Sequence, residues 1–284
     1  MYSKKGQIVK IELPELYQNS LVDEIKEKII RISEMDNTDR YFLNGIIRQI
    51  RPKKVLELGV SSGASSAIIL NAINDIPDAV LYSLDYCTNY YLDESKETGF
   101  IVEQEFPHLL DKWKFRAGGM SCKYLDEIGG DIDMCFIDTV HRVPGEILNF
   151  LEILPYMKKN GVIVLHDTAL HIFRDKQEEN CNCILLSTIK GVKIVPRCHE
   201  TPYIPNIGAA ILDDNAKERI FDIFNLLSLP WKYTLNDEDI DILYNHFKKH
   251  YKREYCELFL DSANFYSKDL GAQLYSDSIV KCQL

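Results

Sequence analysis

The sequence lacks the features that would place it in a membrane or on a nucleic acid. No apolar run among its 284 residues approaches the roughly 18–20 residues of a membrane-spanning helix, because polar or charged side chains interrupt every stretch. Basic residues are outnumbered, with 33 Lys and Arg against 43 Asp and Glu, so the formal net charge is −10. An acidic chain is poorly suited to a surface that follows phosphates. We therefore expect no nucleic-acid and no membrane partner.

The sequence also has few features that would indicate a targeting segment or disulfide bonds. The first residues carry positive charge, but no apolar segment or small-residue cleavage site follows them, which favours a cytoplasmic protein. The 8 cysteines are irregularly spaced in a chain long enough to fold without disulfides, so most should be reduced thiols. One cluster, Cys181 and Cys183 with Cys198 and His199 downstream, has C-x-C rather than C-x-x-C spacing, which disfavours a zinc site.

No Pro-, Gly- or Ser-rich linker, internal repeat or low-complexity tract divides the chain. A hydrophobic content of 46% with 27% charged residues is ordinary for a globular protein, and the length fits one elaborated domain. We expect residues 1–214 to form this domain, including N-terminal helices. Residues 215–284 should form a helical extension packed on it.

Apolar residues at helical spacing predict two amphipathic helices in the first fifty residues, one over 21–32 and one over 42–50. We expect Thr38 or Asp39 to cap the second helix at its N-terminus. Pro52 should end that helix, because the residue before a proline avoids helical geometry.

Short apolar runs, typical of strands buried on both faces, alternate with helix-length segments farther along the chain. The predicted strands are 55–58, 79–84, 132–137 and 161–165, and the predicted helices are 63–74, 121–128 and 144–157. This alternation indicates βαβ units and hence a mostly parallel sheet with helices on both faces.

The pattern changes after this sheet. Strands predicted at 192–195 and 207–212 are too close in sequence for a crossover helix, so they should form an antiparallel edge hairpin. Beyond residue 214 the spacing is helical again, with Pro230 as a stop. We expect this tail to pack on the core, to cover the site or to mediate a homodimer.

A glycine-containing turn follows the first predicted strand. Gly59 and Gly63 permit a tight turn and a close approach of ligand to backbone, while Ser61 and Ser65 bring hydroxyls. Ser61 stands where the dinucleotide motif G-x-G-x-x-G has its second glycine, which argues against a nicotinamide-dependent oxidoreductase. Glu57 beside the turn would repel a diphosphate but suits a cationic amine. The alternative is that the glycines only turn the chain.

Acidic residues follow three further strands. Asp85 comes after the second strand, where a carboxylate can accept both hydroxyls of a ribose. Asp138 and Asp167 follow the strands predicted at 132–137 and 161–165, and on neighbouring strands they would offer two hard oxygen ligands to magnesium or calcium. His141 would stand beside them, and its imidazole can take a proton from a hydroxyl. The alternative for each residue is a helix cap or a solvated surface group.

Two segments resemble motifs of the class I S-adenosylmethionine-dependent methyltransferases. They are Val55 to Ser66, read as VLELGVSSGASS, and Ile132 to His141. The resemblance covers roughly 40–213. It is strongest to the O-methyltransferases related to catechol O-methyltransferase and to the metal-dependent sugar and macrolide methyltransferases. It implies a Rossmann-like, seven-stranded α/β fold, S-adenosyl-L-methionine as cofactor, and in-line methyl transfer to a hydroxyl of a small sugar or secondary-metabolite-like acceptor.

The same resemblance implies roles for particular residues. Those that would bind the cofactor are Glu57, Gly59, Ser61, Gly63, Ser65, Asp85, Gly119, Met120 and Asp138. His141 would be the catalytic base, and Asp138 would help to orient the acceptor. Asp138, Asp167 and Thr168 would hold Mg²⁺ or another divalent cation. Related enzymes carry asparagine or aspartate where this chain has Thr168, a weak neutral ligand, so metal dependence is open while cofactor binding is not.

Two other functions remain as alternatives. A nucleic-acid methyltransferase is disfavoured by the acidic charge and because Val140 and His141 stand where base-flipping enzymes carry a proline-rich aromatic segment. A non-catalytic S-adenosylmethionine-binding or assembly protein is disfavoured because Glu57, Asp85 and Asp138 are intact.

The binding site for the acceptor should be shaped by segments inserted into the predicted sheet-and-helix scaffold. These are residues 86–113, the proline-containing loop 196–206 with His199 and Tyr203, and the tail.

Overall fold

The computed structural model describes residues 10–33, 35–197, 204–213 and 216–270 of the chain. The strands are β1 (Lys54–Leu58), β2 (Val80–Asp85), β3 (Trp113–Ala117), β4 (Ile132–Ile137), β5 (Met157–His166), β6 (Gly191–Ile194) and β7 (Ile207–Leu212). They form one seven-stranded sheet in the order β3-β2-β1-β4-β5-β7-β6.

The pairing confirms the predicted sheet. Strands β1 to β5 pair with one another in parallel, and β7 runs antiparallel to both β5 and β6. In particular β4 lies beside β5, with Ile137 opposite Leu165. The residues that follow these two strands therefore meet at one edge of the sheet, as the site prediction requires.

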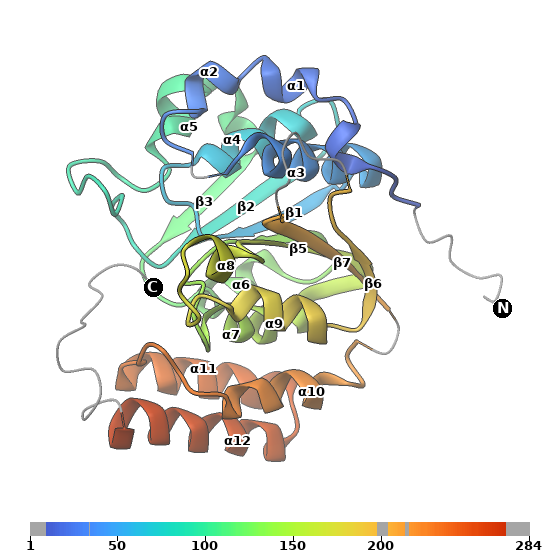
Figure 1. The fold of residues 1–284 in the computed structure, drawn as a ribbon. Coiled ribbons are helices and arrows are strands. Elements are labelled where there is room, and N and C mark those ends of the chain that lie inside the picture. The colour runs from blue at the N-terminus through green and yellow to red at the C-terminus, as the bar shows by residue number, and fades with distance from the viewer. Residues whose placement is uncertain (1–9, 34, 198–203, 214–215, 271–284) are drawn as a thin grey trace, which may run out of the picture.

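Helices cover both faces of the sheet (Figure 1). In chain order they are η1 (Pro14–Leu16), α1 (Ser20–Asp23), α2 (Lys26–Ile29), α3 (Asn37–Ile50), α4 (Ala64–Ile73), α5 (Phe100–Glu105), η2 (Pro107–Lys112), α6 (Cys122–Ile128), α7 (Gly145–Ile153), η3 (Leu154–Tyr156), α8 (Leu170–Phe173), α9 (Cys181–Thr188), α10 (Ile220–Phe224), η4 (Asn225–Ser228), α11 (Asp237–His250), α12 (Arg253–Ala263) and η5 (Asn264–Leu270). Figure 1 shows α3 and α4 on one face and α6, α7 and α9 on the other, with α10 to α12 as an outer layer beyond them. Among the described residues, no helix is both long and apolar enough to cross a membrane.

The first predicted helix is not continuous. The chain forms two separate turns, α1 and α2, although Val22, Ile25 and Ile29 still bury one common face. At the junction the amide of Ile25 donates to the carbonyl of Val22, three residues back, at 3.1 Å. Such shorter-range hydrogen bonds tighten and interrupt an α-helix while they preserve which side is apolar.

The second helix ends where predicted but begins earlier. Asp36, not Thr38 or Asp39, is the N-cap of α3, and its carboxylate accepts the amide of Asp39 at 2.9 Å. Asp39 is buried and makes a different contact, described below. At the other end the helix stops at Ile50, two residues before the proline.

The hydrophobic core is divided by the sheet into two clusters. One cluster lies with α3 and α4. The other contains Leu151 of α7 and Leu165 of β5 together with three fully buried rings of the C-terminal helices, Phe224, Phe247 and Phe259. The outer helical layer is therefore held to α7 by the same kind of close packing that holds α7 to the sheet.

We predict that replacing Phe247 by alanine lowers the free energy of unfolding by about 3–5 kcal/mol, because a wholly buried ring leaves a cavity. Phe221 in the same tail is 46% exposed, so Phe221→Ala is the matched control and should cost less than about 1 kcal/mol. Chemical denaturation of the two variants measures the difference. An equal loss of unfolding free energy in the two variants would show that the C-terminal helices do not share the hydrophobic core.

Candidate functional site

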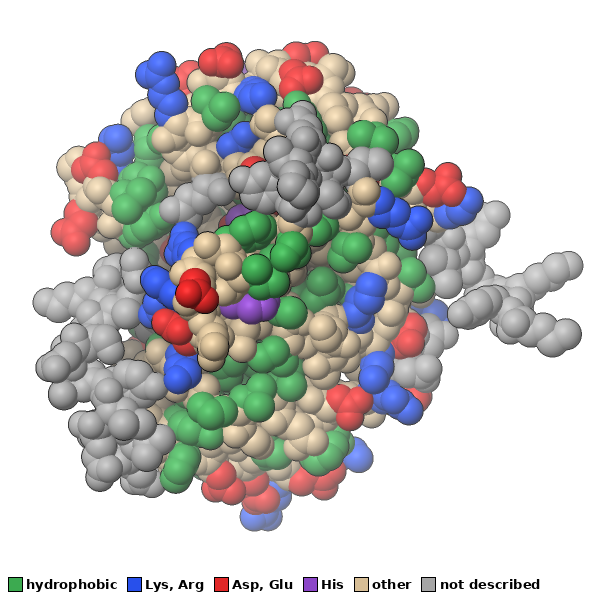
Figure 2. Space-filling view, in the orientation of Figure 1, with side chains coloured by type: hydrophobic (Ala, Val, Ile, Leu, Met, Phe, Trp, Pro, Cys, Tyr) green, Lys and Arg blue, Asp and Glu red, His purple; other side chains and the backbone are tan. Residues whose placement is uncertain are grey.

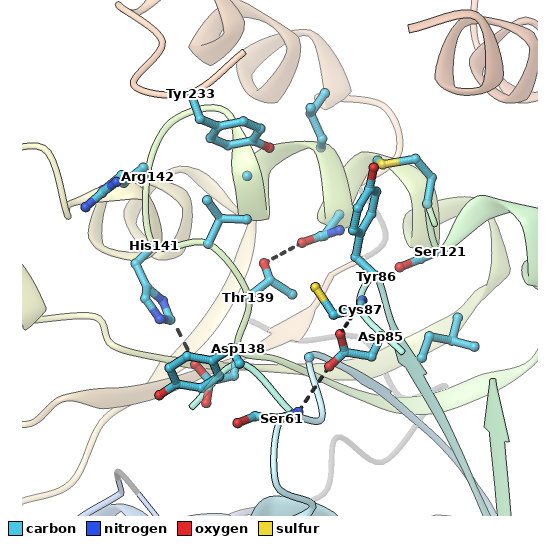
Figure 3. Close-up of a pocket in the computed structure, with 18 of the residues that line it drawn as sticks. Ser61, Asp85, Tyr86, Cys87, Ser121, Asp138, Thr139, His141, Arg142 and Tyr233 are labelled. Carbon is cyan, nitrogen blue, oxygen red and sulfur yellow. Dashed lines mark hydrogen bonds and ion pairs between the residues drawn. The ribbon is translucent and has the colours of Figure 1, made fainter. Parts of the chain in front are cut away.

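A cavity of about 380 Å³ opens at the carboxyl ends of the parallel strands. Its lining includes Gly59 and Ser61 after β1, Asp85 to Cys87 after β2, Gly119 and Met120 after β3, Asp138 to Arg142 after β4, and Tyr233 and Leu235 from the tail. Figure 3 shows Asp85 and Tyr86 on one side of this hollow, and Asp138, His141 and Arg142 on the other. The volume is in the usual range for a small-molecule site.

The turn after β1 requires glycine at its first position. Gly59 has a φ of +86°, and a Cβ there would lie 1.8 Å from the carbonyl oxygen of Asp138. The Gly59 amide donates to the carbonyl of Leu84 at 3.0 Å, and the Asp138 amide donates to that of Leu58 at 2.9 Å. The turn is thus locked between the ends of β2 and β4, where its backbone can approach a ligand closely.

Glu57 lies beneath this turn and is fully buried. The hydroxyls of Ser65, Ser66 and Ser83 each donate to its carboxylate at 2.6 Å, and the Trp113 ring donates to Ser83 at 2.9 Å. Burial raises the pKa of Glu57 to about 7, although the three hydroxyls act against the rise. The glutamate therefore links β1 to α4 and β2 instead of facing the cavity.

Asp85 stands at the cavity wall and shapes the same turn. One carboxylate oxygen accepts the amides of Val60 at 2.7 Å and Ser61 at 3.0 Å, and the other accepts the amide of Cys87 at 2.8 Å. Burial raises its pKa despite these bonds. Ser61 is held at a φ of +52°, in the left-handed region that few residues other than glycine adopt. Asp85 thus fixes the turn while it borders the hollow.

Asp138, His141 and Asp167 form a compact group at the ends of β4 and β5. Each offers a ligand atom within 4.8 Å of those of the other two. His141 Nε2 lies 3.2 Å from Asp167 Oδ2, and its Nδ1 lies 3.9 Å from Asp138 Oδ1. The predicted meeting of the two aspartates is confirmed, and the histidine has joined them as a third donor.

Thr168 follows Asp167, and both its hydroxyl and its amide have partners before β7. The hydroxyl donates to the carbonyl of Pro205 at 3.4 Å, and the amide donates to the carbonyl of Asn206. The role of Thr168 as a third metal ligand stays a prediction. The carboxylates of Asp138 and Asp167 are the hard oxygen donors that Mg²⁺ prefers, and the imidazole of His141 lies beside them.

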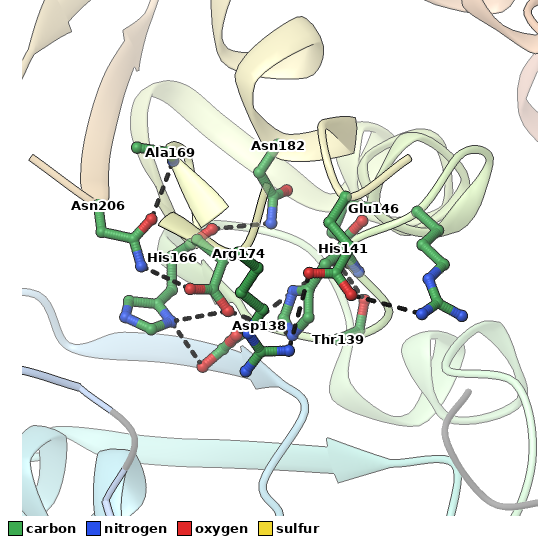
Figure 4. A network of polar contacts seen from close by, with 12 residues as sticks. Asp138, Thr139, His141, Glu146, His166, Ala169, Arg174, Asn182 and Asn206 are labelled. Carbon is green, nitrogen blue, oxygen red and sulfur yellow. Dashed lines mark hydrogen bonds and ion pairs between the residues drawn. The ribbon is translucent and has the colours of Figure 1, made fainter. Parts of the chain in front are cut away.

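A second, buried histidine supports the group from behind (Figure 4). His166 Nδ1 lies 3.3 Å from Asp138 Oδ2 and 3.5 Å from Asp167 Oδ2, while its Nε2 lies 3.2 Å from Asp39 Oδ2 on α3. Asn206 donates to the other oxygen of Asp167 at 2.6 Å. These contacts hold Asp138 and Asp167 in position and connect them to α3.

The two imidazoles balance the crowded carboxylates. Burial by itself lowers the pKa of His141, but Glu146, 3.4 Å from Nδ1, together with Asp167 and Asp138, outweighs burial and raises it to about 9. The pKa of His166 also rises well above its ordinary value, because Asp167 and Asp138 outweigh its complete burial. The nearby carboxylates therefore favour the protonated form of both rings in the metal-free protein.

Two residues of the group have unusual backbone geometry. His141 has a φ of +65° and Asp167 a φ of +55°. The left-handed conformation costs a non-glycine residue of the order of 1 kcal/mol, and residues strained in this way concentrate at functional sites. In this chain the strain turns both side chains toward Asp138.

The predicted cofactor residues fall into two sets. Those that line the cavity are Gly59, Ser61, Asp85, Gly119, Met120 and Asp138. The residues outside its lining are Glu57, Gly63 and Ser65. Glu57 and Ser65 are paired with each other under the turn, and Gly63 caps α4 with a φ of +92°. The cofactor contacts of all nine residues stay predictions.

Several residues of the site were not predicted. Glu146 lies five positions after His141, on the first turn of α7. The helix expected at 144–157 could therefore have identified Glu146 as a neighbour of His141. His166 adjoins Asp167 in sequence, but nothing in the sequence joins it to Asp39, 127 positions away. Of the loop expected to shape the acceptor, residues 198–203, with His199 and Tyr203, lie outside the described residues.

Comparison with known proteins agrees with this geometry. Residues 56–168 match the family model Methyltransf_24, described as a methyltransferase domain. No curated protein matches the sequence at a significant level. The fold is similar to the SAH-bound methyltransferase PaMTH1 of Podospora anserina, at 16% identity over 69% of this chain and 88% of that one, with a TM-score of 0.50. It is also similar to cofactor-bound Rv0187 from MTB, at 15% identity over 69% and 91%, with a TM-score of 0.51.

We predict that the imidazole of His141 titrates near pH 9 when divalent cations are chelated. Because this pKa lies above the unfolded value of about 6.5, the stability it contributes is complete below pH 6.5 and is lost as the pH rises through 9. Glu146→Gln should lower the pKa by removing one carboxylate. NMR of the imidazole nitrogens measures both, and titration near 6.5 in the unaltered protein would contradict the proposed charge balance.

Proposed function

We propose that the chain is a class I S-adenosylmethionine-dependent methyltransferase and that it transfers the methyl group to a hydroxyl oxygen of a small molecule. One observation carries the proposal. Asp138 and His141 line the same cavity that the glycine turn borders, and Asp167 lies directly beside them. Methyl transfer to a hydroxyl requires that the acceptor is aligned with the methyl donor and loses its proton. The carboxylates could align the acceptor, and the imidazole could accept the proton.

The cavity offers the cofactor and the acceptor different surroundings. Asp85 and Tyr86 on one side of the cavity suit a nucleoside that has hydroxyls and a flat base, and Met120 also lines the cavity. The opposite side is formed by His141 and its neighbours, and we assign it to the acceptor. S-adenosylmethionine supplies a methyl group already activated on a sulfonium, so the protein has only to align the acceptor and to remove a proton.

We assign the removal of that proton to His141. In the metal-free cluster this ring carries a proton at neutral pH, so it can accept one only when the charge of Asp138 and Asp167 is balanced in another way. The carboxylates of Asp138 and Asp167 are the hard oxygen donors that Mg²⁺ prefers, and a cation held by them would leave the imidazole of His141 free to accept the proton. Such a cation would supply positive charge that favours the deprotonated acceptor.

Cofactor binding is the first test. Calorimetric titration with S-adenosylhomocysteine should show saturable binding by the purified chain. Transfer of a tritiated methyl group to a panel of sugars and catechols should require MgCl₂ and stop in a chelator. Absence of binding heat at about millimolar ligand would contradict the proposed function.

Variants then separate binding from chemistry. Asp167→Asn and His141→Gln should each lower turnover by roughly 10²–10⁴-fold, because each removes a group that positions or accepts the proton. The affinity for S-adenosylhomocysteine should change by less than about twofold, since neither residue is on the nucleoside side. Asp111→Asn, at an exposed carboxylate, is the control. Full turnover in His141→Gln would remove the proposed base.

A further inference from the structure

Three cationic side chains surround one buried carboxylate at the cavity wall. Glu179 lies 3.4 Å from Arg142, 3.7 Å from Arg174 and 3.5 Å from Lys176. All four residues line the cavity. The side chain of Glu179 is only 4% exposed, whereas Arg174 and Lys176 are each 48% exposed. The carboxylate therefore lies beneath the cations, which face the open side of the hollow.

The group carries more positive charge than its carboxylate needs. One buried carboxylate is balanced by one cation, so three leave an excess of two charges. Among the described residues, Glu179 is the one carboxylate within ion-pair distance of each of these cations. Asp175 and Glu178 of the same segment do not line the cavity and are not paired with these cations, so the excess is confined to the group at the cavity wall.

The contacts are also loose. A tight bond between a cation and a carboxylate is about 2.7–2.9 Å long, whereas these nitrogen–oxygen distances are 3.4–3.7 Å. One oxygen of Glu179, Oε2, has no hydrogen-bond partner although it is buried. The donors of the two guanidinium groups are thus not consumed by Glu179 and remain available to another oxyanion.

The position of the group places it with the acceptor, not with the nucleoside. Arg142 directly follows His141, and Figure 3 shows both on the side of the cavity opposite Asp85. Arg174 and Lys176 lie between α8 and α9, in the segment that follows β5. The excess charge is therefore beside the proposed base.

We propose that Arg142, Arg174 and Lys176 bind an oxyanion group of the acceptor, a carboxylate or a phosphate, and so direct its hydroxyl toward His141. Glu179 occupies the centre of this subsite as an internal counter-ion. The inference rests on the proposed function and narrows it: the substrate class is a hydroxylated carboxylate or phosphate compound, not a neutral sugar. Arginine suits this role because its planar donors match both oxyanions.

The test uses the full chain saturated with S-adenosylhomocysteine, with sodium phosphate and sodium acetate as separate probes. Binding is followed through the NMR signals of the arginine side chains. We expect saturable shifts with at least one probe, weakened about tenfold or more in Arg174→Gln/Lys176→Gln. Glu179→Gln should strengthen binding severalfold, because it removes the competing carboxylate. Phosphate and acetate together show which oxyanion is preferred.

Lys248→Gln/Lys249→Gln is the matched control, since it removes two exposed charges from α11, away from the cavity. No saturable shift with either probe up to about 50 mM would overturn the inference. Equal weakening in the control, or weaker binding in Glu179→Gln, would overturn it too. A loss of S-adenosylhomocysteine affinity in Arg174→Gln/Lys176→Gln as large as the loss of anion affinity would assign the cations to the cofactor instead. Failure of S-adenosylhomocysteine to bind the unaltered chain would count against the proposed function alone.

Discussion

The crowding of carboxylates at the ends of β4 and β5, whose charge must be balanced, is the constraint on which the site depends. Asp39, Asp138, Glu146 and Asp167 all come within 4 Å of an imidazole nitrogen there. Carboxylates this close in a buried setting cannot stay ionised without cations. Two protonated imidazoles meet the requirement in the metal-free protein, and a divalent cation would meet it with the rings neutral. Binding of such a cation would therefore be coupled to loss of protons from the imidazoles.

The same charges divide the cavity into regions with different chemistry. Around Asp85 the amides of Val60 and Ser61 are already satisfied, which gives the cavity a preformed wall on the side that we assign to the nucleoside. Near His141 the surroundings are acidic, and beyond it Arg174 and Lys176 make them basic. An acceptor bound across this boundary would meet a group that removes its proton at one end and cations at the other. Orientation would then come from charge complementarity as well as shape.

The sequence predicted well the features that depend on local pattern. Apolar runs buried on both faces revealed β1, β2, β4 and β5, and strand order then brought Asp138 beside Asp167. By contrast β3 alternates buried and exposed residues, so no apolar run delimited it. The partners of Glu57 and Thr168 could not be predicted either, because a hydroxyl at a given position can serve a ligand or a buried carboxylate equally well. Only the three-dimensional neighbours decide which.

Proton release on metal binding tests the central claim most directly. In weakly buffered, chelator-treated protein at neutral pH, titration with Mn²⁺ should release about one proton or more for each ion bound, because the bound cation and the imidazolium protons balance the same carboxylates. A pH-sensitive dye and the binding isotherm give the ratio. Binding of Mn²⁺ without proton release, or no binding at all, would contradict the account.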